Sequence, residues 1–298
     1  MPFYVSPAQV MRDKAEYARQ GIARGRSCVT LQYAGGILMV APNPSSALHK
    51  ISEIYDRIAF AAVGRYNEYE NLRKAGVTYA DITGYQFDRH DVTARGIANW
   101  YAQTLGTIFT DQLKPFEVEI VVAEVAAKPA DDQIYRITFD GSVTDEPGFV
   151  AFGGQADQVS AALKERYADN MSLSEAFAAA LAALSVPGNG EYTAAQLEVA
   201  ILDRTRDHRT FRRIRAARLE ELLAESRPAA ESSDGDDSGT PAASDAPAAS
   251  EGSEPSASGS APPAPGSAPA RPADSGPPTG PTPGSSDRGS GLSGGSPL

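Results

Sequence analysis

The sequence of 298 residues has one cysteine, Cys28, and three widely spaced histidines, His49, His90 and His208. A single cysteine excludes an intramolecular disulfide and a cysteine-rich zinc site, and the spacing of the histidines argues against a histidine-based metal site. No apolar run approaches the roughly 18 residues that a membrane span needs. Charged side chains occupy the first twenty residues where a secretory signal needs its apolar segment. These absences indicate a soluble, cytoplasmic protein.

Positive charge is also scarce, since 27 Lys and Arg against 38 Asp and Glu leave a formal net charge of −11. This balance does not favour nucleic acid or an anionic membrane as a partner. Residues 227–298 contain 14 Pro, 12 Gly and 16 Ser but no aromatic residue, Ile or Val. Such a segment cannot bury enough apolar surface to offset the entropy lost on ordering. We therefore expect one folded domain over residues 1–226 and a disordered, acidic tail over residues 227–298.

Local patterns predict alternating groups of helices and strands. Ser6 is a good N-cap and Pro7 suits the first helical position, so a helix over residues 7–24 is expected. Two β-rich runs, 28–33 and 37–41, flank an Ala-Gly-Gly turn and predict a hairpin. The further expected elements are, in order, a strand over 58–63, a helix over 66–87, a helix capped by Asp91, strands over 116–122, 135–139 and 149–152, helices over 157–167 and 172–184, strands over 197–202 and 211–214, and a helix over 216–225.

This order of elements bears on the fold class. Pairs of helices alternate with groups of strands that short turns can connect as hairpins. Two antiparallel sheets stacked on each other, with helices on both outer faces, bury the apolar faces of all these elements. The alternative is an α+β domain built around a single sheet.

The search for chemical motifs finds no Gly-rich phosphate loop, no HExxH and no G-x-S-x-G. Cys28 falls within the first predicted strand, where a buried small apolar residue is favoured over a nucleophile. His49 is better explained as a solvated loop histidine than as a general base. From the residues alone, the sequence predicts an α+β domain without a visible active site.

Four long segments carry a more specific signal. They are SPAQVMRDKAEYARQGIARGRSCVTLQYAGGILMVA, HKISEIYDRIAFAAVGRYNEYENLRKAG, NWYAQTLGTIFTDQLKPFEVEIVVAEV and LEVAILDRTRDHRTFRRI. Together they resemble the proteasome α-subunits, and the last two resemble the actinobacterial branch in particular. The resemblance spans about residues 1–225, nearly all of the expected folded part. It implies the four-layer αββα sandwich of the N-terminal-nucleophile hydrolase superfamily, in agreement with the order of elements.

The resemblance also implies a subunit without catalytic residues, a non-catalytic component of a threonine-type endopeptidase complex with no cofactor and no metal. The related β-subunits use a Thr at a processed N-terminus, whose free amine acts as the base. In this sequence Arg26 stands at the position of that Thr and Pro42 at the position of the accompanying Asp, while Lys50 retains the position of the Lys. An alternative is an active hydrolase that uses Ser27 or Cys28 after cleavage at Arg26.

A docking pocket is a second implication of the resemblance. In proteasome α-subunits the lysine lies between neighbouring subunits and pairs with the C-terminal carboxylate of a hexameric ATPase, a charge-assisted contact. Lys50 is the corresponding residue. Gly25 and Gly64 correspond to glycines that let the ATPase tail approach the backbone. We therefore expect an ATPase-docking pocket of Gly25, Lys50 and Gly64.

A gate is the third implication, because the N-terminal segments of seven α-subunits converge on the axial pore in this family. The expected gate residues are Met1, Pro2, Phe3, Tyr4, Val5, Ser6 and Pro7. The implied partners are a homo-heptameric α-ring, a β-ring that performs proteolysis, the hexameric ATPase through its C-terminal tails, and protein substrates tagged with the small ubiquitin-like modifier of actinobacteria. A scaffold ring without a gating role is the remaining alternative.

Overall fold

The structure, a computed structural model, describes residues 6–188 and 190–226, and within these residues the strands form two five-stranded antiparallel sheets. The first sheet has the order β10-β9-β2-β1-β8 and the second the order β3-β4-β5-β6-β7. The first contains β1 (Cys28–Tyr33), β2 (Gly36–Pro42), β8 (Phe149–Phe152), β9 (Leu197–Asp203) and β10 (Phe211–Arg213). The second contains β3 (Ile51–Tyr55), β4 (Ile58–Gly64), β5 (Val118–Glu124), β6 (Gln133–Ile137) and β7 (Val143–Asp145).

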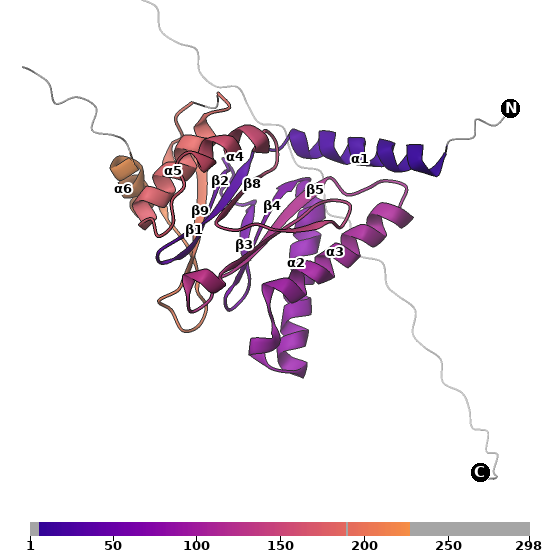
Figure 1. Cartoon of the computed structure of the whole chain (residues 1–298), viewed down its shortest axis with the longest axis horizontal. Coiled ribbons are helices and arrows are strands. Elements are labelled where there is room, and N and C mark those ends of the chain that lie inside the picture. The colour runs from indigo at the N-terminus through magenta and orange to yellow at the C-terminus, as the bar shows by residue number, and fades with distance from the viewer. Residues whose placement is uncertain (1–5, 189, 227–298) are drawn as a thin grey trace, which may run out of the picture. The chain divides into compact units, whose positions relative to one another are not determined.

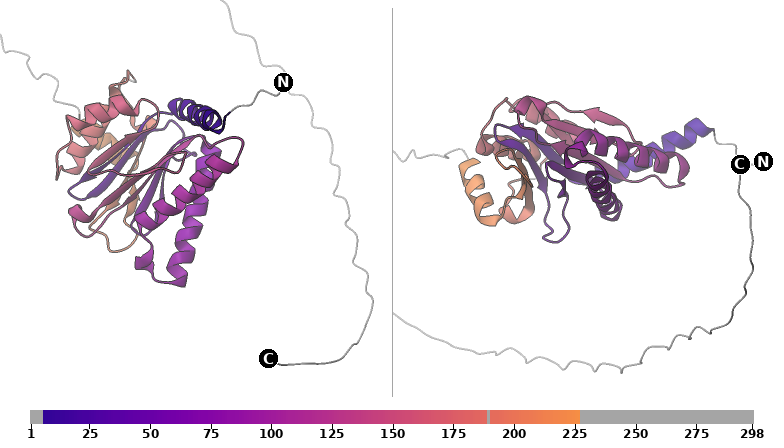
Figure 2. Two further views of the ribbon diagram at one scale, coloured as in Figure 1. Left: turned by 45° about the vertical axis from the view of Figure 1, so that its right-hand side comes forward. Right: turned by 90° about the horizontal axis from the view of Figure 1, so that it is seen from below.

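Helices cover the outer face of each sheet, and Figures 1 and 2 show the strands between two groups of helices. The α-helices are α1 (Pro7–Ala23), α2 (Tyr66–Gln86), α3 (Ala94–Asp111), α4 (Ala156–Lys164), α5 (Leu173–Ser185) and α6 (Ala216–Ser226). Short 3₁₀ turns are η1 (Arg89–Asp91), η2 (Pro129–Asp131) and η3 (Ala194–Gln196). Helices α2 and α3 pack on the second sheet, while α4, α5 and α6 pack on the first.

The alternation of side chains along each strand produces the layers. In β4, Phe60 and its alternate neighbours pack against α2 and α3, whereas Ala59, Ala61 and Val63 face the other sheet. Successive strand residues point to opposite faces, so a strand that is apolar throughout can serve two cores at once. The expected four-layer αββα sandwich is therefore confirmed, and the single-sheet alternative is excluded.

Helix α1 lies across one end of the sandwich instead of joining a layer (Figure 1). Its buried residues Ala18 and Ile22 pack with Phe139. The Nζ of Lys14 donates to the carbonyl oxygens of Phe109 and Gln112, at 3.0 and 2.7 Å. Because these carbonyls belong to the C-terminal end of α3, where the helix dipole is negative, the lysine is well placed there.

The structure differs from the sequence-based expectation at three elements. The strand β3 was not predicted, because a register shift between Glu53 and Tyr55 breaks its alternation. The strand β7 was not predicted either, since all three of its residues are exposed and carry no apolar pattern. Asp91 was expected to cap α3, but it instead closes a capping box with Asp88 around η1. The N-cap of α3 is Thr93, whose hydroxyl accepts a hydrogen bond from the amide of Gly96 at 3.1 Å.

Two predicted segments, the tail over 227–298 and residues 1–5 of the gate, lie outside the described residues. Across residues 6–188 and 190–226, no helix is long and apolar enough to cross a membrane. The same residues contain no group of three His, Cys, Asp or Glu side chains placed to hold a metal ion.

Candidate docking site

Lys50 lies at the end of the connection between β2 and β3 and is half-buried. Its Nζ donates a hydrogen bond to the carbonyl oxygen of Arg26 at 3.3 Å. Among residues 6–188 and 190–226 it forms no ion pair with a carboxylate within 4.0 Å. Burial is the main influence on this amine and lowers its pKa. A carboxylate ligand would therefore meet an ammonium group whose charge is not yet balanced by a direct partner.

The two glycines predicted with Lys50 adjoin one another. A Cβ on Gly25 would lie 2.6 Å from Cγ1 of Val63 and 3.6 Å from the amide nitrogen of Gly64. Gly64 has a φ of +119°, and a Cβ there would lie 1.9 Å from the carbonyl oxygen of Glu117. Gly64 is thus restricted to a residue without a side chain, whereas a side chain at Gly25 would require Val63 to move.

The structure brings the three predicted pocket residues together. Lys50 contacts Arg26, the residue after Gly25. Its carbonyl oxygen also accepts a hydrogen bond from the amide of Ala62 at 3.0 Å, two residues before Gly64 on β4. Segments from α1, β3 and β4 therefore meet at one end of the sandwich and present one ammonium group beside two side-chain-free positions.

The positions that correspond to catalytic residues of β-subunits can also be placed. Arg26 is exposed, and the chain of α1 precedes it, so its nitrogen forms part of a peptide bond. Pro42 ends β2 and pairs with Leu197. Cys28 is fully buried, and burial raises the pKa of its thiol to about 12. The expectation of a buried, apolar role for Cys28 is confirmed.

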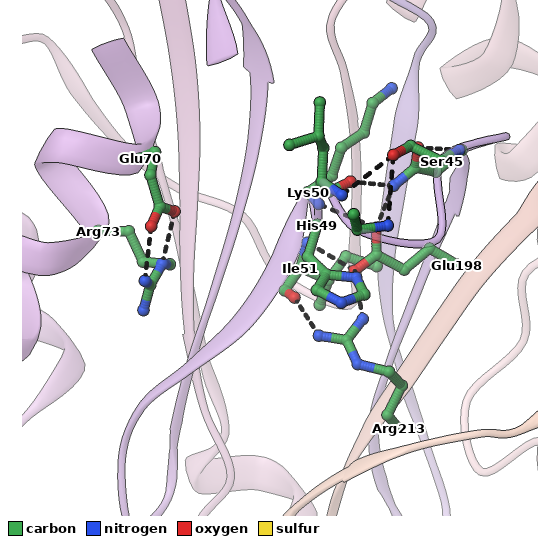
Figure 3. Close-up of polar contacts among 11 residues, drawn as sticks. Ser45, His49, Lys50, Ile51, Glu70, Arg73, Glu198 and Arg213 are labelled. Atoms are coloured by element: carbon green, nitrogen blue, oxygen red, sulfur yellow. Dashed lines mark hydrogen bonds and ion pairs between the residues drawn. The ribbon is translucent and has the colours of Figure 1, made fainter. Parts of the chain in front are cut away.

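Glu198, the second residue of β9, is only 6% exposed and was not predicted from the sequence. Its carboxylate accepts hydrogen bonds from the amides of Lys50 at 2.9 Å and Ile51 at 3.2 Å (Figure 3). A guanidinium nitrogen of Arg213 donates to the same carboxylate, and Nδ1 of His49 lies 3.2 Å from it. The one available signal was an acid inside the otherwise apolar run 197–202, which on its own does not say what the acid binds.

A second group of charged side chains, centred on Glu117, lies next to Gly64 and Gly21. The Glu117 carboxylate lies 2.9 Å from a guanidinium nitrogen of Arg65 and 3.0 Å from the Nζ of Lys114. Burial favours a higher pKa for Glu117, but the hydrogen bond from Lys114 and the charges of both cations outweigh it and lower the pKa. A Cβ on Gly21 would lie 2.2 Å from this carboxylate, so α1 packs closely on it.

The two gate residues within the described part, Ser6 and Pro7, begin α1. The hydroxyl of Ser6 accepts a hydrogen bond from the amide of Gln9 at 3.3 Å, as an N-cap does, and Pro7 occupies the first helical position. Both expectations about the start of this helix are confirmed. At 1.5 Å per residue, α1 separates them from Gly25 by about 25 Å, so the structure does not bring the gate residues to Lys50.

Comparison with known proteins decides the family. The family model described as Proteasome subunit matches residues 22–202, more than half of the chain. A protein of Streptosporangium roseum named Proteasome subunit alpha is 64% identical over 249 residues, which are 83% of this chain and 94% of the relative. A Thermomonospora curvata protein of the same name is 67% identical over 226 residues, 76% of this chain and 98% of the relative. This chain belongs to the proteasome α-subunits.

A third relative, the Proteasome subunit alpha of Saccharopolyspora erythraea, is 59% identical over 241 residues, 80% of this chain and 94% of the relative. The predicted resemblance to actinobacterial proteasome α-subunits is therefore confirmed. A proteasome α-subunit assembles in rings together with β-subunits, and the resulting complex is a protease. The region over which the family model matches contains Gly25, Lys50, Gly64 and Glu198.

Proposed function

We propose that this chain forms the non-catalytic outer ring of a proteasome core particle, where it docks a hexameric ATPase and gates the entry of protein substrates. The observation that carries the docking role is Lys50. Its ammonium group is half-buried, donates to one backbone carbonyl, and has no carboxylate partner in the described part of the chain. The C-terminal carboxylate of an ATPase tail is a ligand of the complementary charge.

The energetics of this contact follow from the partial burial of Lys50. A hydrogen bond to a charged group contributes about 1.5–3 kcal/mol. The ammonium group gains more from a carboxylate than an exposed lysine does, because screening by water is weaker at a half-buried position. The family resemblance implies that Gly25 and Gly64 lie beside the bound tail. In this chain, added Cβ atoms at the two glycines would meet Val63 and the carbonyl oxygen of Glu117, so internal packing also favours glycine at both positions.

Three features support a non-catalytic role over a hydrolase that uses Ser27 or Cys28. An N-terminal nucleophile needs a free amine as its base, whereas α1 precedes Arg26 in the chain. The thiol of Cys28 is buried, and its raised pKa keeps it protonated near neutral pH. The hydroxyl of Ser27 is also buried and donates to the carbonyl oxygen of Gly154 at 3.4 Å.

The assembly that we propose has a homo-heptameric α-ring, a β-ring that carries out proteolysis, and the ATPase bound through its C-terminal tails. It would act in the cytoplasm on proteins carrying the ubiquitin-like modifier of actinobacteria. Residues 1–7 would form the gate at the start of α1, about 25 Å along that helix from the docking pocket. The alternative is a ring that is only a scaffold and has no gate. Deletion of residues 1–5 distinguishes the two, because only a gated particle should then hydrolyse small peptides faster.

The substitution Lys50→Ala tests docking in the assembled particle. The affinity for a peptide with the ATPase's C-terminal sequence should fall by about tenfold to a hundredfold, the equivalent of one charge-assisted hydrogen bond. Degradation of proteins by the complete ATPase complex should fall further, because several tails bind at once. Lys50→Arg should restore binding only in part, since a planar guanidinium does not replace a compact ammonium group.

The matched control is Lys128→Ala, which removes the charge of an exposed lysine next to η2. It should leave peptide affinity unchanged. Titration of the tail peptide and of the ATPase against both variants gives the comparison. If Lys50→Ala and wild-type particles reach half-saturation at the same concentration, the docking role of Lys50 is wrong.

A further inference from the structure

The segment that carries Lys50 has little regular structure of its own. Residues 43–50 connect β2 to β3 and close on themselves through Asn43. The side-chain amide of Asn43 donates to the carbonyl oxygen of Leu48 at 2.7 Å, and its oxygen accepts from the amide of Ser45 at 3.1 Å. These contacts shape the loop. Main-chain hydrogen bonds also tie its two ends, one from the Asn43 amide to the carbonyl oxygen of Gln196 at 2.7 Å and one from the Ala62 amide to the carbonyl oxygen of Lys50 at 3.0 Å.

Glu198 adds a side-chain attachment at both ends of the loop. One oxygen of its carboxylate accepts from Asn43 at 2.7 Å and from the Lys50 amide at 2.9 Å, which are the two ends of the loop. The other oxygen accepts from the amide of Ile51. A single buried side chain on β9 thus contacts the first and last residues of the segment. Figure 3 shows this side chain beside Lys50 and Ile51.

Arg213, and not Lys50, balances the negative charge of Glu198. Its guanidinium donates to Glu198 and also to the carbonyl oxygen of Ile51, at 2.8 Å in the latter case. The carboxylate therefore has a direct cationic partner without using the ammonium group of Lys50. Glu198 binds the main chain of Lys50, while the Lys50 side chain reaches Arg26 and retains its charge for a ligand.

From this geometry we infer that Glu198 is a positioning residue for Lys50: with Arg213 as its counter-ion, it clamps the loop 43–50 so that the lysine presents its ammonium group to the terminal carboxylate of a partner. The inference rests on the proposed docking function and adds a residue that does not itself touch the tail.

The substitution Glu198→Gln removes the clamp and changes the shape of the side chain very little. An amide has one oxygen that accepts, whereas both carboxylate oxygens accept here, each from two donors. In either orientation the NH₂ group of glutamine faces donors, and Arg213 loses its counter-ion. The loop should be loosened, since only the main-chain hydrogen bonds of Asn43 and Lys50 would still hold its ends, while the bulk of the core stays in place.

Asp132, which lies near the other end of β5 and β6, provides a matched control. The buried carboxylate of Asp132 accepts from the Ala126 amide at 2.8 Å and from Arg204 at 2.7 and 2.8 Å. Its neighbour Gln133 pairs with Glu124 on β5, six residues from Val118, which pairs with Gly64. That spacing is about 20 Å along the strand, so Asp132→Asn perturbs a similar buried pair far from the pocket.

Two measurements on assembled particles decide the matter. Hydrogen–deuterium exchange followed by mass spectrometry should show faster exchange over residues 43–51 in Glu198→Gln and no change there in Asp132→Asn. The affinity for the ATPase tail peptide should fall about tenfold in Glu198→Gln only, the equivalent of one hydrogen bond to a charged group. In the Lys50→Ala background the same substitution should change affinity by less than about twofold, because the two residues act through one contact.

The possible results separate the two proposals. Unchanged exchange over residues 43–51 in Glu198→Gln overturns the clamp. An equal loss of peptide affinity with and without Lys50 also overturns the positioning role, since Glu198 would then act on stability alone. If Lys50→Ala does not weaken tail binding, the docking function itself is wrong, and the exchange measurement still decides whether Glu198 holds the loop.

Discussion

Gly64 is the residue of the candidate site at which the structure predicts the effect of a substitution on stability most directly. It ends β4 with a φ of +119°, a conformation that side chains rarely adopt. A Cβ would lie 1.9 Å from the carbonyl oxygen of Glu117 and 3.0 Å from the Cα of Val118. Both are backbone atoms, so no change of rotamer relieves the contact. Gly64→Ala must therefore push the paired ends of β4 and β5 apart.

The size of this effect can be estimated from three contributions. Strain at a positive φ costs about 1–3 kcal/mol. The hydrogen bond from the Arg65 amide to the Glu117 carbonyl, 2.9 Å long, adjoins the clash, and its loss costs about 1 kcal/mol. Displacing a packed strand costs about 1–3 kcal/mol more. The sum of about 3–7 kcal/mol is a large part of the 5–15 kcal/mol that typically stabilises a domain.

Denaturant unfolding of the full chain, at one protein concentration for every variant, measures this loss of unfolding free energy. The control is Gly188→Ala, where φ is +83° but no heavy atom lies within 4 Å of the added Cβ. That variant should lose about 1–2 kcal/mol, from strain alone. If Gly64→Ala does not fold, Gly25→Ala gives an intermediate case, since its Cβ would meet a movable side-chain atom of Val63. Equal losses for Gly64→Ala and Gly188→Ala would refute the reasoning.

Two further predictions concern the gate and pH. Deletion of residues 1–5 keeps the Ser6 cap and should raise hydrolysis of small peptides by the assembled particle. Ser172→Ala, which removes the N-cap of α5 and costs about 1 kcal/mol outside the gate, should not. Unchanged hydrolysis after the deletion would favour a ring without a gate. The pKa of Glu117 is lowered in the folded state, so its stabilisation should be complete well above its ordinary value of 4.5 and be lost as pH falls below it. Unfolding free energies of wild type and Glu117→Gln should therefore draw together as pH falls below 4.5, and a gap that stays constant from neutral pH down to acid unfolding would contradict this assignment.

The elements that were predicted correctly depend on neighbours close in sequence. Ser6 and Pro7 start α1, and the capping box of Ser172 with Glu175 starts α5. The run Ile58–Gly64 reads as a strand because it is apolar throughout. Such signals are local, since a cap or an alternation involves residues within a few positions of each other. Where the local pattern was interrupted, as in β3, or exposed, as in β7, the prediction failed.

The candidate site divides in the same way. Gly25, Lys50 and Gly64 were expected from long segments that resemble a family, and no local pattern assigned them a role. The carboxylate that binds the main-chain amide of Lys50 could not be predicted from the sequence, because Glu198 lies 148 residues away. A buried acid in a strand indicates that donors must be near but not which ones.

The sequence by itself determined where α1 and α5 begin and which faces of the strands are apolar, since these follow from caps and periodicity within short stretches. It also determined family membership, through similarity spread along most of the folded part. Only the tertiary structure decided that α1 closes the end of the sandwich, that Arg213 balances the charge of Glu198, and that the ammonium group of Lys50 is left without a carboxylate in the described part of the chain. These outcomes depend on hydrogen bonds and charges between residues far apart in the chain, and such pairs are set by how the layers pack.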